Sequence, residues 1–160
     1  MLDPELLMQR ALERARAALD AGEPPFAALV AAADSGRVIA SLGDQVLAHR
    51  DWTRHAETEA IRLAVARCGP DLSDYVLVTT VEPCAMCFTA AWLARIRRIY
   101  YGATMAAVAS RTKGRQRELP VSADQINRLS GSVIEVVGGI RADACLEVFS
   151  PDVVPVLGGR

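Results

Sequence analysis

The chain has 160 residues, of which 51% are apolar and 23% charged, and its formal net charge is −1 at pH 7. This size and composition are typical of one globular domain with a real core. We predict a single domain over residues 1–150 and a loose tail over 151–160. The near-neutral charge argues against a large nucleic-acid footprint, which needs a clustered basic face. The densest basic stretch runs from Arg111 to Arg117, and we expect it to be a solvated loop.

The sequence also bears on the compartment of the protein. No apolar run has the length of a membrane span, and the start of the chain has no apolar core typical of a signal peptide. The four cysteines, Cys68, Cys84, Cys87 and Cys145, are too sparse for a disulfide scaffold. Cys68 ends a helical pattern and Cys145 lies inside one, so we predict both as small buried hydrophobes. We therefore expect a cytoplasmic protein without membrane contact.

Apolar residues recur at helical and at strand-like spacing along the chain. Asp3 and Pro4 are typical of a helix start, and that helix should stop at Gly22 and the following prolines. The later elements are predicted as strands over 26–33 and 37–41, an irregular segment over 44–54, a helix over 55–67, a strand over 75–81, a helix from 83, a strand over 98–101, a helix over 123–129, a strand over 133–137 and a helix over 141–149. Strands that alternate with helices predict an α/β sandwich with helices on both faces of one sheet. In such sheets, sites lie beyond the carboxyl ends of the strands.

Two short motifs carry the chemistry, His55-Ala56-Glu57 and Pro83-Cys84-Ala85-Met86-Cys87. The second follows the predicted strand over 75–81 directly. Zinc in catalytic sites commonly takes three protein ligands and keeps one position open for water. H-x-E followed by P-C-x-x-C is a signature of zinc deaminases of bases. The two cysteines would share one face of the first helical turn, where unpaired N–H groups and the helix dipole favour thiolates.

We therefore predict His55, Cys84 and Cys87 as ligands of one Zn²⁺ ion and Glu57 as the catalytic residue. Zinc would lower the pKa of a bound water, and the resulting hydroxide would attack an amino-bearing ring carbon. Glu57 would take the water proton and would then protonate the ring nitrogen and the leaving amine, so that ammonia departs. The other histidine, His49, fits no ligand spacing, so we expect it on a loop or at the rim of the site.

These motifs, with the stretches over residues 25–30, 94–96 and 101–103, resemble the cytidine deaminase-like superfamily. The likeness runs over about residues 6–149 and is strongest to the branch of guanine deaminases, yeast-type cytosine deaminases and bacterial tRNA adenosine deaminases. The resemblance implies a three-layer α-β-α sandwich with a five-stranded mixed sheet, one zinc per chain and a homodimer.

Several positions depart from the family pattern. Trp52 replaces a proline of the zinc motif, and Asp44 stands eleven residues before His55, where relatives usually have an asparagine that holds the base. An ionised carboxylate only accepts hydrogen bonds, so Asp44 favours rings rich in amino or protonated nitrogens. The guanine-deaminase branch has a tryptophan where this chain has Leu93, and Trp92 is about 100° away on a helix. Asp44, Phe26 and Trp92 are the predicted substrate-binding residues.

The main functional hypothesis is a hydrolytic deaminase of a free base or similar N-heterocycle, with guanine as one candidate and water as co-substrate. One alternative is a tRNA adenosine deaminase, for which the basic stretch from Arg111 is the support. Another is a non-catalytic, zinc-stabilised binding domain, for which Asp44 would reflect lost activity.

Overall fold

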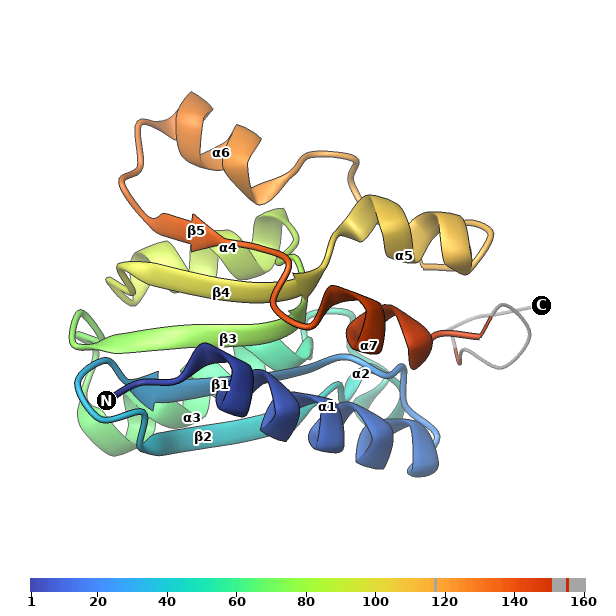
Figure 1. Ribbon diagram of the computed structural model, residues 1–160, viewed down its shortest axis with the longest axis horizontal. Coiled ribbons are helices and arrows are strands. Elements are labelled where there is room, and N and C mark those ends of the chain that lie inside the picture. Colours follow the sequence, from blue (N-terminus) through green and yellow to red (C-terminus); the bar gives the residue numbers. More distant parts are fainter. Residues whose placement is uncertain (117, 151–154, 156–160) are drawn as a thin grey trace.

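The computed structural model describes residues 1–116, 118–150 and 155. Five strands form one mixed sheet in the order β2-β1-β3-β4-β5 (Figure 1). Strand β1 is antiparallel to β2 and β3, whereas β4 is parallel to β3 and β5. The strands are β1 (Ala27–Ala32), β2 (Val38–Gly43), β3 (Tyr75–Val81), β4 (Arg98–Ala103) and β5 (Glu135–Val137). The predicted five-stranded mixed sheet is therefore confirmed.

Helices cover both faces of this sheet. They are α1 (Pro4–Asp20), α2 (Val46–His49), α3 (Ala56–Cys68), α4 (Ala85–Leu93), α5 (Met105–Arg111), α6 (Ala123–Ser130) and α7 (Ala142–Glu147). Helices α3, α4 and α6 share one apolar core, and α1, α5 and α7 share the other. Alternate residues of β1 supply the two cores, Ala28 and Val30 to the first and Leu29 and Ala31 to the second. This is the predicted three-layer sandwich.

Element types agree with the sequence-based predictions except at two short helices. The Asp3 side chain accepts the N–H groups of Glu5 and Leu6 at the start of α1, with Pro4 in the first position as predicted. Helix α2 lies in the segment predicted as irregular, and α5 follows β4, where no helix was predicted. Helix α2 has four residues and no side-chain cap, and α5 buries only Met105 and Val108, so neither has a pattern long enough to recognise.

Three predictions about individual segments were wrong or fall outside the described residues. Cys68 is exposed because it ends α3, where the chain turns at Gly69, whereas Cys145 is buried as predicted. The basic stretch is not a loop throughout: Arg111 ends α5, and its side chain donates to the Phe149 carbonyl. The predicted tail over 151–160 lies outside the described residues, except for residue 155. Among the helices of the described chain, none is long and apolar enough to cross a membrane.

The topology brings the two motifs together. Strand β3 ends at Val81 and the chain continues through Glu82 and Pro83 to Cys84, the N-cap of α4. His55 is the N-cap of α3, which packs against β1, β2 and α4. The N-termini of both helices therefore meet beyond the carboxyl end of β3, as the sequence predicted.

Candidate active site

The three predicted ligands converge in space. His55 Nδ1 lies 3.7 Å from Cys84 Sγ and 3.5 Å from Cys87 Sγ, and the three ligand atoms lie within 4.8 Å of one another. Tetrahedral zinc with usual bond lengths places a ligating nitrogen and sulfur about 3.6 Å apart. Imidazole and thiolate are ligands that zinc prefers. The geometry and chemistry of this cluster therefore fit one zinc ion, with room for a ligand that is not protein.

Burial and the contacts among the three side chains set their protonation states without metal. A hydrogen bond from Cys87, together with His55, lowers the pKa of Cys84 to about 4, against the effect of burial. Burial lowers the pKa of His55, but Cys84 and Glu57 outweigh it and raise that pKa to about 9. The hydrogen bond to Cys84, with burial, raises the pKa of Cys87 well above its usual value. Without metal, the cluster therefore holds one thiolate, one thiol and one imidazolium.

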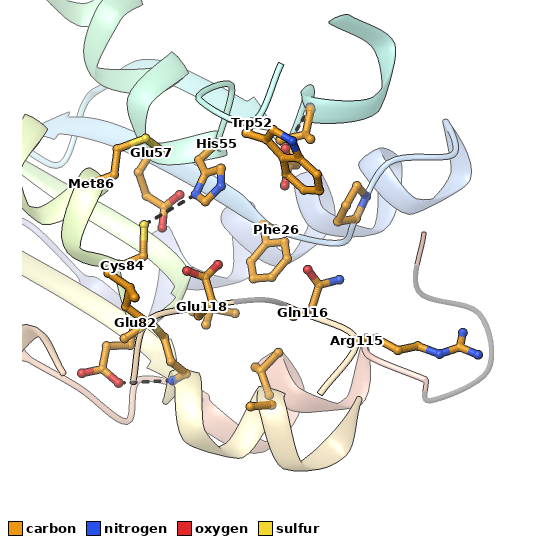
Figure 2. Close-up of a pocket in the computed structure, with 18 of the residues that line it drawn as sticks. Phe26, Trp52, His55, Glu57, Glu82, Cys84, Met86, Arg115, Gln116 and Glu118 are labelled. Atoms are coloured by element: carbon orange, nitrogen blue, oxygen red, sulfur yellow. Dashed lines mark hydrogen bonds between the residues drawn. The ribbon is translucent and has the colours of Figure 1, made fainter. Parts of the chain in front are cut away.

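Glu57 lies beside this cluster at the start of α3 and is only 4% exposed. Figure 2 shows its carboxylate next to the His55 ring, with the Cys84 sulfur directed at the same ring. Burial raises the pKa of Glu57 to about 7, with His55 opposing it. Its Oε1 lies 3.2 Å from the Thr79 hydroxyl, which also lies 2.9 Å from the Val81 carbonyl. The single hydroxyl proton serves one acceptor, so donation to Val81 leaves Thr79 free to accept a proton from Glu57.

A cavity of about 820 Å³ opens over the cluster. His55, Cys84 and Glu57 line its floor, and its walls are mostly apolar, with Phe26 and Met105 among them. A volume of this size is in the range of small-molecule sites. The arrangement can hold a planar ring against a metal ion with a buried carboxyl group beside it.

Two of the three predicted substrate-binding residues line this cavity. Phe26 is half-buried and packs edge-on against Phe149, with ring centroids 5.1 Å apart. Asp44 follows β2 directly and is 6% exposed. Burial raises the pKa of Asp44 to about 6, although a hydrogen bond from the Val46 N–H lowers it. The structure therefore brings a carboxylate to the wall of the pocket.

Trp92 does not lie there. It is 56% exposed and lines a different surface depression together with Leu93 and Val133. Helix α4 buries Cys87, Phe88 and Ala91, so its next residue points away from the core. The tryptophan at the cavity is instead Trp52, which is 60% exposed at its mouth (Figure 2). His49 is exposed at the end of α2, apart from the ligand cluster.

Sequence reasoning missed Glu118 and Gln116. Both lie between α5 and α6 and line the cavity, and Figure 2 shows the Glu118 carboxylate pointing toward the space below His55 and Glu57. Burial, with the charge of Cys84 second, raises the pKa of Glu118 to about 7. Gln116 Nε2 is buried with no hydrogen-bond partner among the described residues. No motif or spacing marks either residue, because the segment that carries them is irregular.

Two further buried carboxylates support the walls of the cavity. Glu82 accepts the backbone N–H groups of Met105 and Ala123, which ties α5 and α6 to the end of β3. Glu23 accepts the N–H groups of Leu47 and Ala48 at 2.9 and 2.6 Å, which fixes the start of α2. Both carboxylates are satisfied by backbone donors, so we assign them to positioning.

Comparisons with known proteins agree with this geometry. Residues 1–103 match the family described as the cytidine and deoxycytidylate deaminase zinc-binding region. A tRNA(Ile)-lysidine synthase of Deinococcus deserti is 39% identical over 143 residues, which are 89% of this chain and 25% of that protein. A tRNA-specific adenosine deaminase of Agrobacterium fabrum is 43% identical over 97 residues, 60% of this chain and 62% of that protein. The chain thus spans less than two thirds of these curated relatives.

A solved guanine deaminase from Nitrosomonas europaea has the same fold. It superposes with a TM-score of 0.83 at 32% identity, covering 92% of this chain and 83% of that one. With the zinc-binding region matched and the His–Cys–Cys cluster assembled, this chain belongs to the cytidine and deoxycytidylate deaminase family of zinc-binding proteins.

Proposed function

We propose that the chain is a zinc-dependent hydrolytic deaminase of a free nucleobase or a similar amino-substituted N-heterocycle. The observation that carries the proposal is the buried Glu57 carboxylate beside the His55, Cys84 and Cys87 cluster at the floor of a cavity of about 820 Å³. A metal site that only stabilises the fold takes four protein ligands and has no use for such a carboxylate. The fit of the cluster to three protein ligands favours a catalytic site.

His55, Cys84 and Cys87 would hold the zinc ion, which supplies a Lewis acid that makes a bound water acidic near neutral pH. Glu57 is placed to accept a proton near neutral pH, because burial raises its pKa to about 7. It then gives this proton to the ring nitrogen, and afterwards carries the proton of the added hydroxyl group to the leaving amine, so that the carbonyl forms as ammonia departs. Thr79 steadies the carboxyl group in either protonation state. Phe26 and the other apolar walls hold the ring and exclude bulk water.

The test is an ammonia-release assay on zinc-loaded protein. The panel comprises guanine, cytosine, isocytosine, adenine and aminotriazines, and at least one should be turned over. Glu57→Gln should lower the rate by about 10²- to 10⁴-fold and still bind about one zinc per chain. Glu13→Gln, an exposed carboxyl on α1, is the matched control and should change neither. A panel that is inert with zinc-loaded protein would contradict the proposal.

A second candidate is deamination of adenosine in a tRNA anticodon loop. It is favoured by the 43% identity to a tRNA-specific adenosine deaminase and by the exposed Arg115 at the cavity rim. The two candidates differ in binding, because an RNA ligand should bind tightly with an affinity that falls steeply with salt. A labelled anticodon stem-loop, titrated at low and moderate salt, separates them.

We also propose that the protein forms a homodimer through the exposed surface of α4. Trp92 and Leu93 on this helix are 56% and 68% exposed and line one surface depression with Val133, which is 94% exposed, and apolar patches of this kind mark protein interfaces. Leu93→Glu should shift the mass measured by light scattering from dimer to monomer. A reducing compartment suits the site, because Cys84 and Cys87 must stay reduced to bind metal as thiolates.

A further inference from the structure

The proposed reaction uses Glu57, but it assigns no role to two other carboxylates at the same cavity. Asp44 and Glu118 come from opposite halves of the chain, and both line the cavity over His55. Burying a carboxylate without a partner costs free energy, and such groups are retained where a ligand supplies the missing donors. The hydrogen-bond partners that Asp44 and Glu118 lack therefore indicate which groups a ligand of this pocket must supply.

Asp44 is held in place by its own backbone. Its N–H donates to the Phe26 carbonyl at 3.0 Å, and its Oδ1 accepts the Val46 N–H at 3.0 Å. Among the described residues, Oδ2 has no hydrogen-bond partner, and Asp44 does line the cavity. One oxygen therefore shapes the loop and the other is available to a ligand.

Glu118 is half-buried, and no described residue donates a hydrogen bond to it. Figure 2 shows its carboxylate pointing into the cavity on the side that faces His55 and Glu57. In the same view the Arg115 side chain extends outward, away from Glu118. Arg115 therefore does not neutralise the Glu118 carboxylate, and Arg117, its neighbour in the chain, lies outside the described residues.

Few hydrogen-bond donors lie inside the cavity, because the Arg115 and Trp52 side chains that also line it are exposed at its mouth. Gln116 Nε2 is the unpartnered amide donor among the described lining residues, set against the free oxygens of two carboxylates. The rings of Phe26 and Trp52 complete the walls, and aromatic faces attract flat, positively polarised rings. The pocket is therefore rich in acceptors and suited to a flat ligand rich in N–H donors.

We propose that Asp44 and Glu118 make the site selective for planar heterocycles with two amino groups, such as diaminopyrimidines or diaminotriazines. Rings in which a carbonyl replaces one of these amino groups bind less well. This rests on the proposed function and deepens it. Where a ring carries a carbonyl opposite Asp44, two acceptors face each other and neither finds a proton. Where it carries an amino group, a charge-assisted hydrogen bond forms instead.

The test compares 2,4-diaminopyrimidine with cytosine, which share the 4-amino group and differ at position 2, where cytosine has a carbonyl in place of an amino group and carries a hydrogen on N1. Binding to zinc-loaded Glu57→Gln protein is measured by calorimetry at pH 7.5, so that turnover does not interfere. 2,4-Diaminopyrimidine should bind at least about 10-fold more tightly, as one hydrogen bond to a charged group contributes that much. Asp44→Asn and Glu118→Gln, each added to Glu57→Gln, should each reduce the preference.

Asp44→Asn keeps an oxygen for the Val46 N–H, so the loop should stay folded, which circular dichroism checks. Asp51→Asn is the matched control, because Asp51 lies in the same segment, bonds to Thr53 and does not line the cavity.

Equal or tighter binding of cytosine, or a ranking that either carboxamide variant leaves unchanged, would overturn the proposal. If the protein releases ammonia from carbonyl-bearing bases and neither variant changes the binding preference, the proposed function stands and this selectivity is refuted. An enzyme inert on every base would refute the function, while the binding comparison would still decide the selectivity.

Discussion

The backbone N–H of Asp44 donates a 3.0 Å hydrogen bond to the carbonyl of Phe26. This bond extends the pairing of β1 and β2 by one step beyond Gly43, so an aromatic ring and a carboxylate enter the same cavity from one rigid corner. Because the sheet fixes this corner, Asp44 cannot turn outward to recover its lost hydration. An acidic residue here therefore carries a stability cost that depends on pH.

Asp44→Asn should stabilise the metal-free protein above pH 6. Burial raises the pKa of Asp44 to about 6, so the folded state binds a proton that the unfolded state has released between about pH 4 and pH 6. Stability is therefore lost as pH rises through this window, and the loss is constant above it. Asp44→Asn removes this loss in the free energy of unfolding, which is roughly 1–3 kcal/mol at pH 8 and vanishes below about pH 4.

Urea unfolding of both proteins at pH 4, 6 and 8 measures this difference. Asp51→Asn is a control of opposite sign, because hydrogen bonds from Thr53 lower the pKa of Asp51. That substitution should weaken the protein near neutral pH. A gain from Asp44→Asn that does not grow between pH 4 and pH 6 would show that Asp44 is not buried as an anion.

Metal binding should release protons. Without metal, His55 has a pKa raised to about 9, Cys87 has one raised further, and Cys84 has one lowered to about 4. Near pH 7 two protons must therefore leave before all three groups can coordinate. The apparent affinity for zinc should rise by about 100-fold per pH unit between pH 6 and pH 8.

Competition with a chelator at several pH values measures this slope, and a pH indicator in weak buffer counts the released protons. Cys87→Ser should lose most of the affinity. Cys68→Ser is the matched control, because Cys68 is an exposed cysteine at the end of α3 and should leave the slope unchanged. An affinity that does not vary with pH would mean that the cluster is already deprotonated.

The sequence was sufficient to predict that His55, Cys84 and Cys87 come together, because coordination chemistry restricts which residues can be used and how they are spaced. Cys84 and Cys87 had to share a helical turn, and His55 had to begin another helix beside it, whatever the surrounding packing. The sheet was predictable for a similar reason, since the apolar runs of β1 and β3 are long and bounded by turn residues. These features depend on local pattern, which a single sequence contains.

The rest of the cavity was not predictable, because it depends on packing between distant segments. The orientation of Trp92 follows from which residues of α4 face the core, and one step around the helix moves it to a separate surface. Glu118 reaches the site because Glu82 holds α5 and α6 against the end of β3, and with them the irregular segment between these helices. No spacing in the sequence encodes that contact.

Gly102→Ala should destabilise the fold by about 1–3 kcal/mol without altering metal binding. Gly102 lies in β4, and a Cβ there would meet the Cys145 sulfur of α7 and come within 2.6 Å of the Thr80 carbonyl. Cys145→Ala relieves only the first clash, so the double variant should recover part of the loss. Gly131→Ala, where a Cβ meets open space but φ is +68°, should cost less. Urea unfolding measures the free energy of unfolding, and metal analysis measures the zinc bound per chain. If Gly102→Ala left the free energy of unfolding unchanged, α7 would not be packed against β4.

Glu23→Ala should loosen the corner that carries Asp44. Glu23 accepts the N–H groups of both Leu47 and Ala48, so its removal leaves two donors at the start of α2 unpaired, at a cost of about 1–3 kcal/mol. Hydrogen exchange should rise over residues 44–54 and stay unchanged in β3. Glu23 does not line the cavity and positions the corner that carries Asp44, so KM should rise more than kcat falls on any base that the protein deaminates. Glu23→Gln, which keeps one acceptor oxygen, should recover part of both losses. Glu13→Ala on the exposed face of α1 should change none of these measurements. A Glu23→Ala protein with unchanged exchange over 44–54 would show that the loop is held by the Phe26 and Val46 bonds of Asp44 alone.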